Sequence, residues 1–153
     1  MPGFKGKEQF SIDEKGRVSF PAKMKKYLPP KTKRRFTVLR GWDRQACLLV
    51  YPQDAWEKLE RELHARLNPY VEKDRLFLRH VLENAEELEL DGAARLCIPR
   101  HLLDLAGIEK QALLIGVSDH IELWNPDRYH NLHKSTVDNI SDLAAEVMGD
   151  GRG

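Results

Sequence analysis

The chain has 153 residues, of which 41% are hydrophobic and 32% charged, and its formal net charge at pH 7 is +1. This length fits one ordinary domain, and no apolar run approaches the roughly 18 residues of a membrane-spanning helix. The first residues, MPGFKGKEQF, lack the apolar segment of a signal peptide. These features predict a soluble, cytoplasmic protein that does not associate with a membrane.

Positive charge is concentrated near the N-terminus. Residues 1–35 contain eleven Lys or Arg and three Asp or Glu, a net charge of +8 in a chain that is nearly neutral as a whole. Such an asymmetry favours a polyanionic partner such as nucleic acid, although lysines can also serve to keep an edge or a helix soluble.

The first half of the chain contains the patterns of strands followed by helices. Alternating apolar residues on either side of DEKG predict two short strands joined by a tight turn, followed by a short helix at AKMKKYL. FTVLRGWDRQACLLVY predicts two more strands around GWDRQ. A helix comes next, with a capping-box spacing at Asp54 and Glu57. Its apolar stripe consists of Trp56, Leu59, Leu63 and Leu67.

A helix from about residue 68 to 84 connects this half to a second one that repeats it. LELDGAARLCIP repeats the strand, turn and strand, RHLLDLAGI the short helix, and ALLIGVSDHIELW the second strand pair, before a helix at NPDRYHNLHKSTV. Equivalent residues are 78 apart at Asp13 and Asp91 but 73 apart at Tyr51 and Trp124. We attribute the missing five residues to the loop KTKRR, and we interpret the pattern as an internal duplication.

Each repeated unit has only about 45 residues, too few to bury a stable core alone. We therefore predict an α+β fold in which a duplicated β core forms one pseudo-twofold domain, with helices after each half. The predicted boundaries are repeat 1 at 7–54, a helical connector at 55–84, repeat 2 at 85–128, and a C-terminal helix with a disordered tail at 129–153.

Each half carries Asp and Arg four residues apart across its first turn. We expect Asp13 to accept hydrogen bonds from backbone N–H groups of its own turn and to pair with Arg17, and Asp91 to do the same with Arg95. Gly16 suits a turn position that needs a positive φ. These interactions predict that the two acids and the glycine shape the turns.

The arginines of this motif have a further capacity. A guanidinium held by one acid still has N–H donors for a phosphate or for the O6/N7 edge of guanine. The first copy adds Lys15 at the turn, where the second has Ala93. The two turns are therefore expected to be similar in shape but unequal in charge.

The remaining reactive residues do not suggest an enzyme. The apolar runs ACLLVY and RLCIP predict that Cys47 and Cys97 are buried and reduced. His130 and His133 with Asp127 resemble metal ligands, but further ligands with suitable spacing are not evident. The sequence has no Gly-rich phosphate loop, no G-x-S-x-G and no H-E-x-x-H. We expect no catalytic residue, no metal, no cofactor and no small-molecule substrate.

Several segments together resemble a known family: DEKGRVSFP, CLLVYP with the helix that follows, DGAARLCIP, and ELW. They are similar to the MraZ family of bacterial transcriptional regulators in the SpoVT–AbrB superfamily, which carries two D-x-x-x-R motifs in one chain. The resemblance implies swapped-hairpin β elements and a ring-shaped homo-oligomer. It also implies a nucleoid location and sequence-specific binding to repeated sites in duplex DNA, in the promoter of a cell-wall and cell-division gene cluster. We expect the protein to act there as a repressor, although the sequence does not distinguish repression from activation.

The family's DNA-contacting arginine and basic turn residue correspond to Arg17 and Lys15, with Arg95 in the second copy. From the basic N-terminal segment we add Lys5 and Lys7 as contacts to phosphates, which would position the protein without reading bases.

The family usually has glycine where this chain has Ala94. Alanine tolerates positive φ poorly, so the conformation of the second turn is open at this point.

Two other binding functions remain open on the sequence alone. The duplicated core could be an oligomeric protein-interaction scaffold of antitoxin-like type that does not read DNA. RNA binding is a weaker alternative, because the aromatic residues that would stack on bases lie mostly in apolar stripes. We interpret DEKGR as the copy that faces DNA and DGAAR as the copy that mainly holds the fold. The size of a ring, the operator sequence, any regulating ligand or protein, and whether the second repeat contacts DNA are not evident from the sequence.

Overall fold

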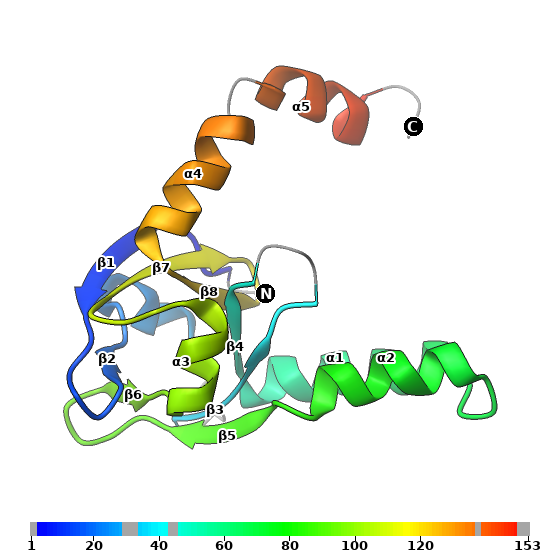
Figure 1. The fold of residues 1–153 in the computed structure, drawn as a ribbon, viewed down its shortest axis with the longest axis horizontal. Coiled ribbons are helices and arrows are strands. Elements are labelled where there is room, and N and C mark those ends of the chain that lie inside the picture. The colour runs from blue at the N-terminus through cyan, green and yellow to red at the C-terminus, as the bar shows by residue number, and fades with distance from the viewer. Residues whose placement is uncertain (1–2, 29–33, 43–45, 137–138, 150–153) are drawn as a thin grey trace.

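The computed structural model describes residues 3–28, 34–42, 46–136 and 139–149. Within these ranges the chain folds into a six-stranded antiparallel sheet, a separate two-stranded ribbon and several helices (Figure 1). The predicted α+β class is confirmed. None of the described helices is both long and apolar enough to cross a membrane.

The strands of the large sheet lie in the order β1-β7-β8-β4-β3-β5, and β2 pairs with β6 in the ribbon. The strand bounds are β1 Lys7–Ser11, β2 Arg17–Ser19, β3 Arg35–Arg40, β4 Leu48–Pro52, β5 Glu86–Glu89, β6 Arg95–Cys97, β7 Gln111–Val117 and β8 His120–Trp124. The helix bounds are η1 Ala22–Tyr27, which is a 3-10 helix, α1 Gln53–Arg66, α2 Glu72–Leu82, α3 Arg100–Ala106, α4 Pro126–Thr136 and α5 Ile140–Met148.

The two halves exchange their first strands. β1 pairs with β7 of the second half, and β5 pairs with β3 of the first half. The short strands β2 and β6 pair with each other across the molecule. The expected tight turn joins β1 to β2, but each of these strands forms its ladder with the other half. Neither half can complete the sheet alone, so the duplication yields one shared fold.

The register of the strands locates the residues that the second half lacks. Equivalent positions are 78 apart at Gln9 and Glu87, which face Leu113 and Thr37 respectively. Thr37 and Leu113 are themselves 76 apart. Their partners in the next strands, Tyr51 and Trp124, are 73 apart. The prediction of a single shortened loop at KTKRR was therefore wrong, because two residues are missing before β7 and three in the β7–β8 connection.

Apolar side chains fill both faces of the large sheet. One cluster lies between the sheet, the underside of the ribbon, η1 and α3, and includes Val18, Met24, Phe36, Leu96 and Leu114, none more than 1% exposed. A second cluster packs the opposite face against α1, α2 and α4. The ribbon is thus held on the sheet by the core, which leaves its other face outward.

Helix α1 has the predicted apolar stripe but not the predicted cap. Trp56 and Leu63 are buried, and Leu59 and Leu67 pack against the same cluster. The helix begins after Pro52, whose fixed φ suits a helix start, and no side chain caps this end. Asp54 lies inside the first turn, where its charge favours the helix dipole.

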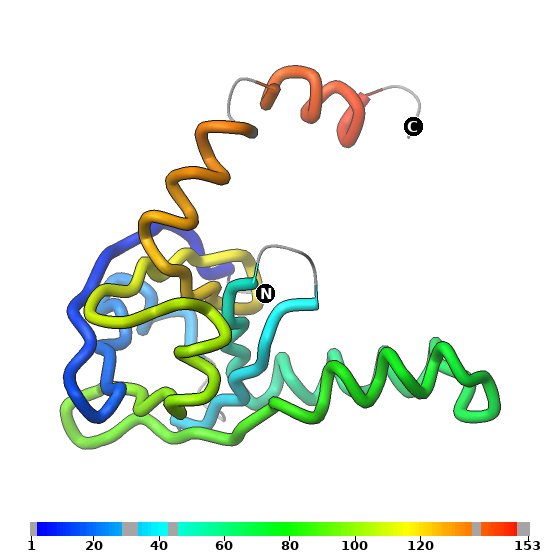
Figure 2. The backbone as a smooth tube through the Cα atoms, in the orientation of Figure 1, coloured from blue at the N-terminus to red at the C-terminus, as the bar shows by residue number. Residues whose placement is uncertain are grey.

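Two helical arms extend from the β body, one made of α1 and α2 and the other of α4 and α5 (Figure 2). The region of the predicted C-terminal helix contains two helices, α4 and α5. Residues 137–138, and 150–153 of the predicted disordered tail, lie outside the described ranges. Helix α5 has no buried residue.

Candidate nucleic-acid interface

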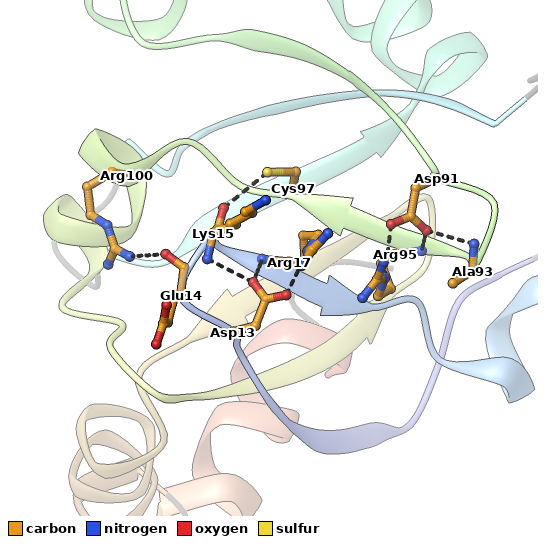
Figure 3. A network of polar contacts seen from close by, with 9 residues as sticks. All are labelled: Asp13, Glu14, Lys15, Arg17, Asp91, Ala93, Arg95, Cys97 and Arg100. Carbon is orange, nitrogen blue, oxygen red and sulfur yellow. Dashed lines mark hydrogen bonds and ion pairs between the residues drawn. The ribbon is translucent and has the colours of Figure 1, made fainter.

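The first D-x-x-x-R turn is closed by one carboxylate. Asp13 Oδ1 accepts hydrogen bonds from the backbone N–H groups of Lys15 and Arg17, both at 2.9 Å. Asp13 Oδ2 lies 2.6 Å from Arg17 Nε (Figure 3). These bonds fix the direction of the arginine side chain while using one of the five N–H donors of its guanidinium.

The second turn has the same geometry. Asp91 Oδ1 accepts from the backbone N–H groups of Ala93 and Arg95 at 2.9 Å, and Oδ2 lies 2.9 Å from Arg95 Nε (Figure 3). The side chains of Arg17 and Arg95 are 34% and 35% exposed. The chain therefore presents two equally constrained and partly exposed guanidinium groups.

The hydrogen bonds within each turn lower the pKa of its aspartate. The backbone N–H of Arg17 is the largest of the effects that lower the pKa of Asp13, to about 2. The corresponding bond from Arg95 lowers the pKa of Asp91. In return, the hydrogen bond to Asp13 raises the pKa of Arg17. Each turn is consequently an ion pair at neutral pH.

Gly16 and Ala94 occupy the equivalent position in the two turns, and both have positive φ, +84° and +58°. Their N–H groups donate to Asp13 and Asp91 O at 3.0 and 2.9 Å. The value at Ala94 lies in the narrow left-handed region open to residues with a Cβ, whereas that at Gly16 lies outside it. The second turn thus keeps the geometry of the first turn without the glycine.

The ribbon carries both arginines on one face. Arg17 stands opposite Cys97, and Ser19 stands opposite Arg95, while Val18 pairs with Leu96. The central pair points into the core, with each side chain 1% exposed. Because side chains alternate along a strand, the other four share the outward face. We call Arg17, Ser19, Arg95 and Cys97 the ribbon face.

The first turn is supported by residues of the second half that the sequence did not suggest. Arg100, at the start of α3, donates to Glu14 O at 3.3 Å, and Cys97 Sγ lies 3.1 Å from Lys15 O. Lys110 O accepts from Ile12 N–H at 2.8 Å. Ile12 and Lys110 both line a hollow of about 630 Å³ beside the turn. Sequence spacing alone gives no sign of these contacts, because they depend on the exchange between halves.

The other two predicted DNA contacts lie elsewhere. Lys7 begins β1, and its carbonyl accepts from Lys23 Nζ at 3.1 Å. Lys5 Nζ lies 5.7 Å from the centre of the Tyr27 ring. A strand rises about 3.3 Å per residue, so roughly 13 Å separates Lys7 from Ser11 at the other end of β1, two residues before the turn begins at Asp13. The structure brings Lys15, Arg17 and Arg95 together but not Lys5 and Lys7 with them.

The prediction for the cysteines is correct for one of them. Cys47 is buried at 2% exposure, but Cys97 is exposed. The run RLCIP is apolar yet alternates in β6, so that Leu96 and Ile98 point inward and Cys97 points outward. Apolar neighbours in sequence therefore gave the wrong burial for this thiol.

Among the residues that the structure describes, no group of three or more His, Cys, Asp or Glu could hold a metal ion.

The comparison with protein families agrees with the doubled motif. The family model of the MraZ protein, which is described as antitoxin-like, matches residues 4–80 and again residues 81–149. The chain belongs to the MraZ family. The two successive matches to the MraZ model fit the duplicated core that the strand pairing shows.

Whole-length MraZ relatives give the same result. The transcriptional regulator MraZ of Natranaerobius thermophilus is 35% identical over 146 residues, 95% of this chain and 96% of the relative. That of Christiangramia forsetii is 34% identical over 144 residues, 94% and 92% of the two chains. That of Syntrophomonas wolfei is 32% identical over 146 residues, 95% and 96%. The names of these MraZ proteins describe regulators of transcription rather than enzymes.

Proposed function

We propose that this protein is a sequence-specific regulator of transcription that binds duplex DNA through its D-x-x-x-R turns. The observation that carries the proposal is the pairing of Arg17 with Asp13, which fixes the direction of a partly exposed guanidinium on a hydrogen-bonded turn. A preorganised arginine is suited to two parallel hydrogen bonds with guanine O6 and N7. The names of the whole-length relatives support the same function.

The cations near the first turn differ in their proposed roles. Arg17 reads a base, and Lys15, on the same turn, binds a phosphate. Arg95 is the equivalent contact of the second copy. Lys5 and Lys7, roughly 13 Å or more from the first turn along β1, bind a phosphate farther along the backbone of the DNA.

The finer role follows the family resemblance. The protein acts in the nucleoid as a repressor at repeated sites in the promoter of a cell-wall and cell-division gene cluster. Several copies assemble into a ring, so that weak contacts on successive sites combine through their effective concentration. Exposed apolar side chains on the two arms support contacts between copies, including Tyr70 at 89%, Ile140 at 57% and Met148 at 82% exposure.

The test is a footprint on the DNA immediately upstream of the coding region, with a mass measurement of the particle in solution. We expect protection at evenly spaced short sites by the wild-type chain and by Arg61→Ala, a control for loss of an exposed arginine on α1. Arg17→Ala should protect none of them. No shift of duplex DNA even at low salt would instead favour the antitoxin-like scaffold.

A further inference from the structure

Lysine side chains of the first half gather at one flank of the body. Lys23 and Lys26 are three residues apart on η1, and residues with this spacing lie on the same face of a 3-10 helix. Lys23 Nζ donates to Lys7 O at 3.1 Å. The Nζ atoms of Lys26 and Lys5 lie 5.2 and 5.7 Å from the centre of the Tyr27 ring. We call the four exposed residues Lys5, Lys7, Lys23 and Lys26 the lysine flank.

The equivalent surface of the second half is acidic. Residues 78 apart are equivalent in the two halves, so the two lysines of η1 correspond to His101 and Asp104 on α3. His101 Nε2 lies 3.8 Å from Glu86 Oε1 at the start of β5, the strand equivalent to β1. We call Glu86, Glu87, Glu89 and Asp104 the acidic flank. Arg35, 3.7 Å from Glu89, offsets only one of these charges. Because β1 and β5 are the two edges of the large sheet, the flanks lie on opposite sides of the body (Figure 1).

Protection of the sheet edges does not account for this difference in sign. Charged side chains on an edge strand discourage pairing with strands of other chains, and Lys23 covers one carbonyl of β1 in this way. Charge of either sign can serve that purpose, and β5 carries glutamates instead. Two ammonium groups beside one tyrosine ring also repel each other, and an anion between them would offset that repulsion. Lysines gathered on one side only therefore indicate a polyanionic ligand on that side.

The lysine flank adjoins one end of the ribbon. Phe20 N–H donates to Ala94 O at 2.9 Å, and η1 begins two residues after Phe20, so this helix starts beside the second turn. Ile98 N–H donates to Gly16 O at 2.9 Å, and α3 starts in the same way beside the first turn. A duplex that lies on the ribbon face therefore has lysines beyond one end of the ribbon and acids beyond the other.

We propose that Lys23 and Lys26 bind phosphates, so that the lysine flank holds the DNA backbone beyond one end of the ribbon only. The equivalent residues Val18 and Leu96 stand opposite each other, so a pseudo-twofold axis passes through the ribbon and its backbone is alike in either direction. The lysine flank attracts DNA at one end, and the acidic flank repels it at the other. This difference fixes the direction in which each copy lies on its site. The inference rests on the proposed function and adds a one-sided contact to it.

The first experiment is a hydroxyl-radical footprint on a duplex with a single site taken from the protected DNA upstream of the coding region. Wild type should protect the DNA backbone farther on one side of the site than on the other. The double variant Lys23→Ala/Lys26→Ala should lose this extension while still protecting the site itself. Lys73→Ala, at an exposed position on α2, is the control and should keep it. A wild-type footprint of equal extent on both sides would overturn the proposal.

A charge reversal on the other side tests the direction separately. Asp104→Lys places a lysine at the exposed position of α3 that is equivalent to Lys26. This variant should add protection of the backbone on the side of the site that wild type leaves open. A footprint identical to that of wild type would contradict a direction set by the charges of the two flanks.

The salt dependence of affinity gives a further readout. Each phosphate contact contributes about 0.9 to the salt slope for duplex DNA, so the double variant should lower the slope by roughly two. It should weaken the site and a random duplex by the same factor, and Lys73→Ala should leave both unchanged. An unchanged slope for the double variant would overturn the proposal. A changed particle mass at wild-type affinity for DNA would also overturn it, because the lysine flank would then contact another copy.

The two proposals fail in different ways. If the wild-type chain protects no site upstream of the coding region, the function as a sequence-specific regulator fails. If sites are protected and the double variant keeps the wild-type footprint and salt slope, the proposed function stands and the phosphate contacts of η1 are wrong.

Discussion

Ala94 adopts, at φ +58°, the turn position that Gly16 adopts at +84° in the other half. An added Cβ at Gly16 would lie 2.5 Å from the carbonyl oxygen of Ile98, which is backbone and cannot move aside cheaply. The two turns therefore share a hydrogen-bond pattern while tolerating different side chains. This difference can be measured through the stability of the protein.

Exchange of these residues should change stability in opposite directions. Ala94→Gly should stabilise the protein by about 0.5–1 kcal/mol. Glycine removes the strain of a left-handed φ, and this gain exceeds the cost of the greater conformational freedom that glycine gives the unfolded chain. Gly16→Ala should destabilise it by about 2 kcal/mol or more, through both strain and the backbone clash. Urea denaturation measures both. Gly92→Ala, where an added Cβ meets nothing within 4 Å, is the matched control.

Acid should remove the contribution of the first turn. The pKa of Asp13 is lowered to about 2 in the folded protein, below that of an unfolded aspartate near 4. A carboxylate whose pKa is lower in the folded than in the unfolded protein stabilises the fold at any pH above its unfolded pKa. This stabilisation disappears as the pH falls through the folded pKa.

The comparison of wild type with Asp13→Asn isolates this effect. Their difference in free energy of unfolding should be constant from pH 7 to about 5 and should shrink between about pH 4 and 2. Denaturant titrations across that range measure it. A difference that stays constant down to pH 2 would exclude a charge-dependent role for Asp13.

Because the halves exchange strands, they should unfold together. Val38 and Leu114 are equivalent residues in β3 and β7, and both lie in the cluster beneath the ribbon at no more than 1% exposure. We expect Val38→Ala to cost about 1–3 kcal/mol and Leu114→Ala about 2–5 kcal/mol, each shifting one common transition. Leu76→Ala, at a 52% exposed position, should change stability by less than about 0.5 kcal/mol. Two separate transitions would mean that the halves fold independently.

The parts of the fold that could be predicted from sequence are those with local causes. An acid that accepts N–H groups two and four residues later closes its own turn, so the roles expected for Asp13 and Asp91 needed no tertiary information. The stripe of α1 is likewise a matter of helical period. Contacts between halves were not predictable: Arg100 reaches Glu14 only because the halves exchange strands.

The cysteine at the ribbon shows the same limit. An apolar run does not say whether a residue faces the core or the solvent until its strand has a partner, and Cys97 pairs across the molecule with Arg17. The second half lacks two residues before β7 and three between β7 and β8, and this division could be seen only from the pairing register of the strands. For the candidate site, the sequence predicted which residues contact DNA, and the pairing of β2 with β6 placed two of them, Arg17 and Arg95, on one face.

The most direct test of the account is the ratio of dissociation constants for random duplexes and for duplexes that carry a site protected upstream of the coding region, measured over a salt series for wild type, Arg17→Ala and Lys7→Ala. A base-reading arginine predicts that Arg17→Ala brings the ratio close to one. A phosphate contact predicts that Lys7→Ala weakens both complexes alike and lowers the salt slope by about one. If Arg17→Ala kept the wild-type ratio, the assignment of the Asp13–Arg17 turn as the reader of DNA would be wrong.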